Sequence, residues 1–161
     1  MPISVAGPRS PRGVSSPLAA LVRGTLALEG RRAGEIAIVL TGDAELRTLN
    51  RRWRGLDRAT DVLSFGDDAD GAATTAAGRR PVRGDLAISM DRVREQARRF
   101  RVTRARELAR LVVHGALHLA GLDHHTAVER RHMRAREERA LLSGRTAIAA
   151  LRRALEAAPR D

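Results

Sequence analysis

The chain has 161 residues, with 30 basic and 19 acidic side chains and a formal net charge of +11. This length is typical of one domain, so we expect a single domain over residues 1–161. The absence of cysteine excludes disulfides, thiolate zinc sites and cysteine nucleophiles, and no apolar run approaches the ~18 residues that a membrane span needs.

The first 66 residues predict an alternation of strands and helices. In chain order they are a strand over residues 1–6, a loop over 7–16, a helix from 17 to the glycines at 30–34, a strand over 35–40, a helix over 44–54 and a strand over 61–65. Ser16 before Pro17 predicts the N-cap and the first residue of the first helix. The prolines that interrupt residues 1–17 argue against a signal peptide, so we expect a cytoplasmic protein.

Residues 67–83 are rich in Gly, Ala, Asp and Thr and predict a flexible loop with a solvated acidic tip at Asp67, Asp68 and Asp70. The remainder predicts, in order, a strand over 84–90, a helix capped by Asp91, a helix from Thr103 to about residue 120, a helix over 129–142 ended by Gly144, and a C-terminal extension over 145–161 that is helical to residue 159. Strands that alternate with helices indicate one α/β or α+β layered structure.

The positive charge attracts polyanions, and nucleic acid is the commonest polyanion in a cell. Every basic residue is arginine, however, and alanine is abundant. Two explanations therefore stay open: a selected basic surface, or the composition of a GC-rich genome with a modest selected patch. The aromatic residues are only Trp53, Phe65 and Phe100, which argues against an aromatic platform for single-stranded nucleic acid.

The most informative stretch runs from His114 to His124 and holds three of the five histidines. His114 and His118 are four residues apart on a predicted helix, so both imidazoles point the same way. Gly121 ends that helix and turns the chain, which brings His124 back toward them. Three imidazoles with a position left for water form the catalytic zinc arrangement. The spacing therefore predicts one zinc ion per chain, although imidazole sites also accept nickel, copper or iron.

The same spacing occurs in metzincin proteases, so peptide hydrolysis is an alternative function. Those enzymes carry Glu directly after the first histidine as the general base. This chain has Gly115 at that position, and no Met-turn segment follows His124. The pattern predicts the metal site without the proteolytic base. His125 and His132 lie outside the pattern, and we expect both on the surface, with a supporting role toward the ligands left open.

Three blocks of this sequence resemble the YbeY family of bacterial single-strand-specific endoribonucleases and rRNA maturation factors. They are the histidine block (His114, Gly115, His118, Gly121, Asp123 and His124), the run LNRRWR over residues 49–54 with Asp57 and TDVLSF over 60–65, and GDLAIS over 84–89. Their order and spacing agree with the family across residues 35–143. The sequence departs from the family pattern at Trp53, where Tyr is usual, at Gly66, where Pro is common, and after Gly144.

The resemblance implies an α+β domain with a small mixed β-sheet of about four strands packed by helices. The metal site would lie on a central helix and the turn that follows it. The implied activity is metal-dependent cleavage of single-stranded RNA in 16S rRNA maturation and ribosome quality control. The implied partners are 16S rRNA and the ribosome or its proteins.

The resemblance also points to Arg54 as the cation that faces the site, where a guanidinium fork meets the negative charge that develops on phosphoryl oxygens. The alternative is that Arg54 only complements the dipole at a helix end. Arg51, Arg52 and Arg58 are expected either along an RNA path or as ordinary exposed residues. Asp123 either orients a histidine or caps the turn.

A different class of function is a ribosome assembly factor whose metal is purely structural. Structural zinc sites usually have four protein ligands, whereas only three residues fit the pattern here. A fourth protein ligand, for which the adjacent His125 is the candidate, would favour this alternative.

Overall fold

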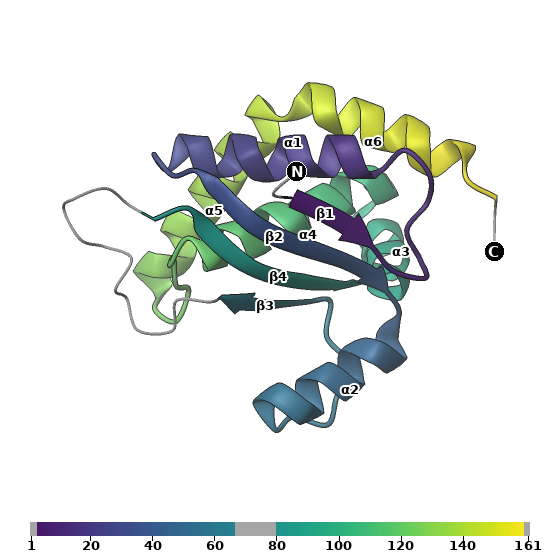
Figure 1. The fold of residues 1–161 in the computed structure, drawn as a ribbon, viewed down its shortest axis with the longest axis horizontal. Coiled ribbons are helices and arrows are strands. Elements are labelled where there is room, and N and C mark those ends of the chain that lie inside the picture. Colours follow the sequence, from purple (N-terminus) through teal and green to yellow (C-terminus); the bar gives the residue numbers. More distant parts are fainter. Residues whose placement is uncertain (1–2, 67–79, 160–161) are drawn as a thin grey trace.

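The computed structural model describes residues 3–66 and 80–159, and Figure 1 shows their arrangement. In chain order the elements are β1 (Ile3–Ala6), α1 (Ser15–Leu28), β2 (Ala33–Thr41), α2 (Asp43–Arg54), β3 (Val62–Gly66), β4 (Val82–Ser89), α3 (Met90–Phe100), α4 (Arg104–Leu119), α5 (Ala127–Ser143) and α6 (Arg145–Ala157). These four strands and six helices have the α+β organisation that the resemblance implies.

The described strands form one mixed sheet in the order β1-β2-β4-β3. β1, β2 and β4 run parallel, and β3 pairs with β4 in the antiparallel direction. The β-branched sequence of β2 suits its place inside the sheet. Ile36, Ile38 and Leu40 are buried on one face, and the residues between them point to the other face. β3 lies at one edge of the sheet, and this edge borders the site described below.

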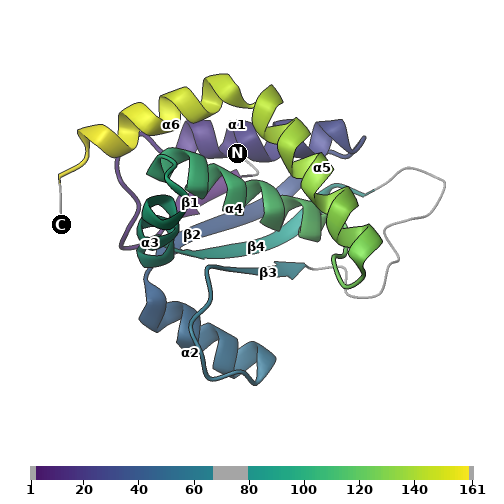
Figure 2. The same ribbon diagram turned by 180° about the vertical axis from the view of Figure 1, so that it is seen from behind.

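Helices cover one face of the sheet, as Figure 2 shows from behind. α1 and α4 pack against the sheet and against each other, and α6 packs across both of them. α4 is the central helix, because it contacts α1, α3, α5, α6, β3 and β4. Its side chains Leu108, Leu111 and Val112 belong to the main core. The helix that carries the predicted metal ligands is therefore held from several sides.

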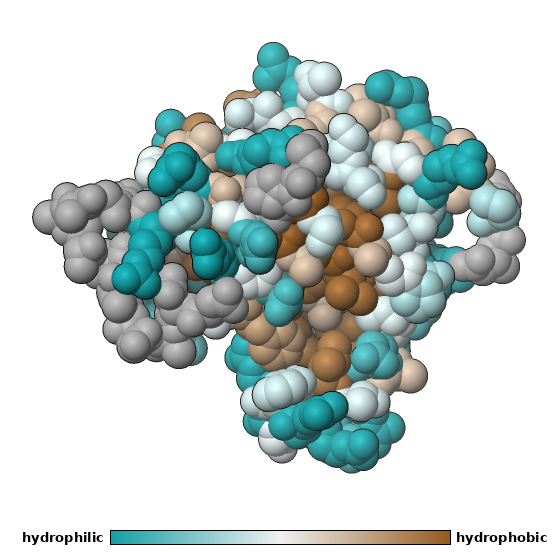
Figure 3. Space-filling view, in the orientation of Figure 1, coloured by the Kyte–Doolittle hydropathy of each residue, from teal (hydrophilic) through white to brown (hydrophobic). Residues whose placement is uncertain are grey.

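α2 packs on the opposite face of the sheet, beside β3. Leu46 of α2 forms a small second core with Leu63 and Ala87, and Leu49 and Phe65 pack against it. α2 leaves the part of this face over β1 and β2 open (Figure 1). Apolar side chains consequently reach the surface at the centre of this face (Figure 3).

α1 and α5 begin earlier than the sequence predicts. α1 begins at Ser15 with Val14 as its N-cap, so Ser16 and Pro17 lie inside its first turn. Proline is tolerated there because the first N–H groups of a helix have no intrahelical partner. α5 begins at Ala127 rather than at residue 129, because the preceding threonine caps it through a capping box.

The cap of α3 is also corrected. β4 ends at Ser89 rather than at residue 90, and the Ser89 hydroxyl accepts the Arg92 N–H at 3.2 Å. Asp91, which the sequence predicts as the cap, lies in the first turn of α3. Its Oδ2 accepts the Asp43 N–H at 2.9 Å, so this carboxylate stabilises the start of α2 instead.

The flexible loop predicted over residues 67–83 lies outside the described residues as far as residue 79, as does its acidic tip at Asp67, Asp68 and Asp70. The end of the predicted loop is wrong, because Val82 and Arg83 belong to β4. The C-terminal extension forms α6, which ends at residue 157 rather than 159. Within the described ranges, no helix has the length and apolar character needed to span a membrane.

Candidate metal centre

α4 carries two of the three histidines that the sequence predicts as ligands. Thr103 caps this helix, since its hydroxyl accepts the Arg106 N–H at 3.1 Å. α4 lies close against β4 at Gly115, where an added Cβ would stand 2.7 Å from Leu86 Cδ2. Any side chain here would have to displace Leu86, so glycine permits this close approach of α4 to β4.

A tight turn after α4 returns the chain toward the helix. The Gly121 N–H donates to the His118 carbonyl at 2.9 Å, and the Leu122 N–H donates to the Leu117 carbonyl at 3.1 Å. Gly121 has a φ of 99°, in the left-handed region that favours glycine. This turn brings His124 next to the two histidines of the helix.

The three imidazoles face one another. One nitrogen from each of His114, His118 and His124 lies within 4.8 Å of the other two. The Nε2 atoms of His114 and His118 are 3.1 Å apart. The ring centroid of His124 lies 5.2 Å from that of His114 and 4.6 Å from that of His118. The structure therefore brings the three predicted ligands into one cluster with the dimensions of a single metal site.

A buried carboxylate that the sequence analysis missed lies behind His114. Glu137 Oε1 is 2.5 Å from His114 Nδ1, and the Glu137 side chain is 10% exposed. A carboxylate accepts, so Nδ1 carries the proton and Nε2 keeps its lone pair toward the cluster. Glu137 lies between Met133 and Leu141 in the buried stripe of α5. Glu137 could have been found from the sequence, because it occupies a position four residues from each of two apolar residues, where a buried apolar side chain is expected.

Two observations fit a metal ion at this cluster. His124 Nδ1 is buried and has no hydrogen-bond partner within the described structure, and such an atom costs free energy unless it is bonded or bound to a cation. Burial, followed by the charges of His114 and His124, lowers the pKa of His118 to about 4. The His118 ring is therefore neutral at pH 7 and can bind a metal. Neutral imidazoles suit zinc and other transition metals.

The histidines lie in a groove of about 460 Å³ between α4 and the edge strand β3. Arg54 reaches this groove from the C-terminal end of α2. Its Nη2 donates to the Ser64 carbonyl at 2.7 Å, which fixes the guanidinium at the edge of β3. Most of its N–H donors remain available to an anion in the groove.

A second cation in the groove was also missed by the sequence analysis. Arg110 lines the groove and precedes His114 by one helical turn. Its Nε and Nη2 donate to the two carboxylate oxygens of the buried Glu107, at 3.0 and 2.7 Å. This bond raises the pKa of Arg110 and holds its side chain in place. The (i, i+4) spacing of Arg110 and His114 on a predicted helix was the available signal.

Arg51, Arg52 and Arg58 are not among the residues that line the groove. All three are exposed, on α2 or on the segment between α2 and β3. The guanidinium of Arg52 lies 5.3 Å from the ring centroid of Trp53. The structure therefore separates these three arginines from the groove that holds the histidine cluster.

Asp123 and His125 lie at the rim of the groove beside His124. Asp123 Oδ1 is 3.5 Å from His125 Nε2, and the His125 side chain is 80% exposed. The His125 ring stacks on that of His124 with a centroid distance of 5.9 Å. Neither His125 nor the exposed His132 belongs to the histidine cluster in the described part of the chain. Both histidines are at the surface, as the sequence predicts.

A family model described as Endoribonuclease YbeY matches residues 15–144. Endoribonuclease YbeY of Roseiflexus castenholzii is 50% identical over 105 residues, which cover 65% of this chain and 66% of that protein. Endoribonuclease YbeY of Chloroflexus aggregans is 51% identical over 106 residues, which cover 65% of this chain and 69% of that protein. The match thus spans about two thirds of the length of these relatives.

A solved structure with a similar fold is the solution structure of TM1509 from Thermotoga maritima. Its TM-score is 0.57 and it is 25% identical in sequence. The match covers 89% of this chain and 92% of that one.

Proposed function

Because the chain belongs to the Endoribonuclease YbeY family, we propose that it is a metal-dependent endoribonuclease that cuts single-stranded RNA. The observation that carries the proposal is the groove that holds three facing histidines and two arginines. Its cellular role in this proposal is maturation of 16S rRNA and ribosome quality control, in the cytoplasm and in contact with the ribosome or its proteins. The whole chain, residues 1–161, acts as one domain.

His114, His118 and His124 hold one zinc ion in this proposal. When bound, zinc supplies Lewis acidity, which activates water as a nucleophile and withdraws electrons from a phosphoryl oxygen. Glu137 fixes the Nδ1–H tautomer of His114 and so presents Nε2 to the metal. The low pKa of His118 keeps its ring unprotonated at neutral pH. The described cluster contains three histidines, which supports an open, catalytic position rather than a closed structural one.

Arg54 and Arg110 hold the RNA phosphate. Hydrolysis places extra negative charge on the non-bridging oxygens in the transition state, and fixed donors stabilise that charge without reorganisation. Arg54 is fixed by the Ser64 carbonyl, and Arg110 is fixed by Glu107. Both guanidinium groups are therefore oriented before substrate binds. Arg51, Arg52 and Arg58 contact the RNA strand outside the groove.

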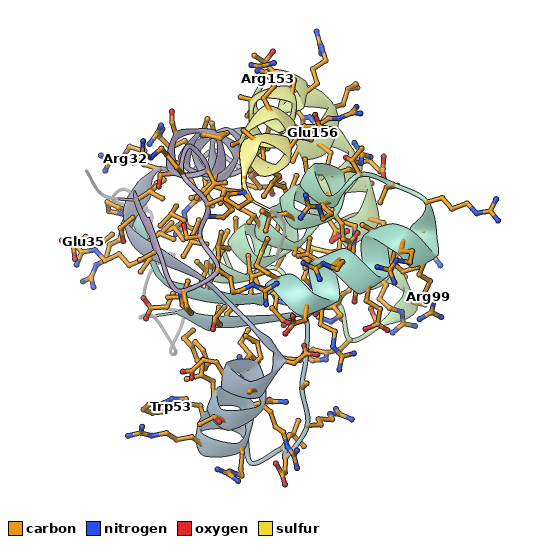
Figure 4. The ribbon with its side chains drawn as sticks, turned by 90° about the vertical axis from the view of Figure 1, so that its right-hand side faces the viewer. Arg32, Glu35, Trp53, Arg99, Arg153 and Glu156 are labelled. Carbon is orange, nitrogen blue, oxygen red and sulfur yellow. The ribbon has the colours of Figure 1, made fainter. Side chains whose placement is uncertain are left out.

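The experiment is a cleavage assay on single-stranded RNA, with the zinc content measured on the same samples. We expect Arg54→Ala to keep the fold and the metal, because Arg54 is exposed and lies outside the histidine cluster. Its cleavage rate should fall about 100- to 1,000-fold, the usual cost of one transition-state donor. His114→Ala should lose both metal and cleavage. Arg153→Ala is the matched control, since Arg153 projects from the other end of the molecule (Figure 4).

Equal cleavage by wild type, Arg54→Ala and His114→Ala would show that the activity is a contaminant. The chain would then fit a ribosome assembly factor better than an enzyme. Loss of cleavage in His114→Ala alone would keep the metal chemistry and remove Arg54 from the mechanism.

A further inference from the structure

Two of the three aromatic side chains meet at the end of α2. The rings of Trp53 and Phe65 are in edge contact, with centroids 6.4 Å apart and an interplanar angle of 64°. Trp53 is 61% exposed. The low aromatic content of the sequence argues against a stacking platform. Composition alone, however, does not show that Trp53 and Phe65 lie together in space.

The exposure of Trp53 follows from how α2 sits on the sheet. Leu46, Leu49 and Trp53 form one apolar stripe along α2, at helical spacing. Leu46 is fully buried and Leu49 packs against the same small core, whereas Trp53 extends beyond it. Figure 4 shows Trp53 at the side of α2. A large apolar ring held in this way is available to bind a partner.

This ring is connected to the groove through two residues. The guanidinium of Arg54, which lines the groove, lies 5.6 Å from the ring centroid of Phe65. Phe65 in turn contacts Trp53. Arg54 therefore links the groove of the histidine cluster to the Phe65–Trp53 pair.

We propose that Trp53 stacks on a base of the RNA strand where the strand leaves the groove. This inference rests on the proposed function and adds a base contact outside the reacting phosphate. Phe65 supports the edge of the indole. The Arg52 guanidinium lies over one face of the ring, 5.3 Å from its centroid, so the base stacks on the opposite face and Arg52 meets the adjoining phosphate. Stacking accepts every base, because each has a π-face. Trp53 therefore increases affinity for single strands without selecting a sequence.

The charges around the ring favour RNA over a protein partner. Arg51, Arg52, Arg54 and Arg58 surround Trp53 in sequence and are all exposed. The acidic residue of this segment, Asp57, is bonded to Arg47 at 2.8 Å. A positive groove with aromatic rings is the combination by which proteins bind single strands.

The test uses the intrinsic fluorescence of the protein, because Trp53 is the only tryptophan and the chain has no tyrosine. The wild-type metal-loaded protein is titrated with a 12-nucleotide oligouridylate on ice, and separately with inorganic polyphosphate of matched charge. We expect the oligouridylate to quench the emission and polyphosphate to leave it nearly unchanged, since only the former carries bases. Equal quenching by both ligands would overturn the stacking proposal.

Cleavage kinetics supply the second arm. Trp53→Ala should raise KM roughly 10- to 100-fold, the range for losing one stacked base, and should leave kcat close to wild type because the contact is the same in ground and transition states. Trp53→Phe keeps a ring and should recover much of the affinity. Phe100→Ala is the matched control. Phe100 is 51% exposed, and its ring also lies under an arginine, Arg99. Arg99 projects on another side of the molecule from α2 (Figure 4).

The other possible results also decide whether Trp53 stacks on an RNA base. An unchanged KM in Trp53→Ala, or an equal rise in Phe100→Ala, would overturn the proposal. A change of oligomeric state in Trp53→Ala, without quenching of the wild type by oligouridylate, would identify the ring as a protein contact instead. If the wild type cleaves no RNA, the proposed function fails, while the fluorescence titration still tests stacking.

Discussion

Glu137 shows how one buried side chain prepares a histidine for metal binding. An imidazole binds a metal through one nitrogen only, and the hydrogen bond at the other nitrogen selects which one is free. Glu137 makes that bond to His114 Nδ1 at 2.5 Å. Because Glu137 is on α5 and His114 is on α4, the ligand geometry depends on how these two helices pack.

We predict that Glu137→Gln lowers zinc affinity about 10- to 100-fold, the usual cost of losing such a partner. The amide keeps the shape of the side chain and removes its charge, so the fold should survive. Competition with a chelator measures the affinity. Glu138→Gln is the control, since the Glu138 side chain is 74% exposed. A zinc affinity of Glu137→Gln equal to that of wild type would mean that the charge of the carboxylate does not contribute to metal binding.

At the residue scale, sequence identifies ligands more readily than their supports. The three histidines are recognisable because a helix and a glycine turn fix their relative positions locally. Glu137 is 23 residues from His114, and its contact depends on the packing of two helices. α5 is otherwise rich in exposed Arg and Glu, so one buried carboxylate among many charged residues was not conspicuous.

At the scale of elements, the capping box of α5 fixes the chain directly after the metal turn. The Thr126 hydroxyl accepts the Glu129 N–H, and the Glu129 carboxylate accepts the Thr126 N–H, both at 3.0 Å. The bond from the Thr126 N–H, followed by the Thr126 side chain, lowers the pKa of the Glu129 carboxyl group. The helix that carries Glu137 therefore begins at Ala127, three residues after His124.

Thr126→Ala should destabilise the protein by about 1 kcal/mol at pH 7, the usual cost of losing an N-cap. The lowered pKa of Glu129 means that its part of the box is fully present above its ordinary pKa of 4.5 and is lost as the pH falls below that value. Because alanine keeps the backbone N–H that the Glu129 carboxylate accepts, this loss occurs in both proteins, and the difference between wild type and variant should change little as the pH falls below 4. Urea unfolding at several pH values measures it.

Thr146→Ala is the control for that series, because Thr146 is an exposed residue of α6 and should change stability by less than about 0.5 kcal/mol. A Thr126→Ala variant as stable as wild type at pH 7 would show that water replaces the cap without cost.

The elements themselves were largely predictable, and their ends were not. β2 is recognisable from its β-branched run, but Ser89 and Asp91 are both good caps, and local sequence does not decide between them. Asp91 is diverted by a tertiary contact with the start of α2. The order β1-β2-β4-β3 likewise depends on contacts between distant segments, which periodicity alone does not contain.

At the scale of the whole molecule, the question is whether the charge of +11 is a recognition surface or only genome composition. The arginines near the groove come from α2, its following segment and α4. If four of them neutralise phosphates, RNA affinity should fall roughly 50-fold between 50 and 200 mM salt.

Single substitutions separate the two explanations. Arg58→Ala should reduce the slope of log affinity against log salt by about 0.7, the value for one phosphate contact on a single strand. Arg153→Ala, on α6, should leave the slope unchanged. Fluorescence anisotropy of a labelled oligonucleotide provides the measurement. Equal reductions in both variants would mean that the charge acts diffusely, as composition predicts.

Gly115 also limits how this protein can evolve. It occupies the position at which metzincins with the same histidine spacing carry their general base, and an added Cβ there would stand 2.7 Å from Cδ2 of the fully buried Leu86. A single codon change to glutamate would therefore overpack the core before it offered any new chemistry. The Leu86 side chain would have to shift, or a smaller residue would have to replace it, before glutamate fitted at this position. A directed-evolution campaign toward that activity should therefore begin in β4, not in the helix.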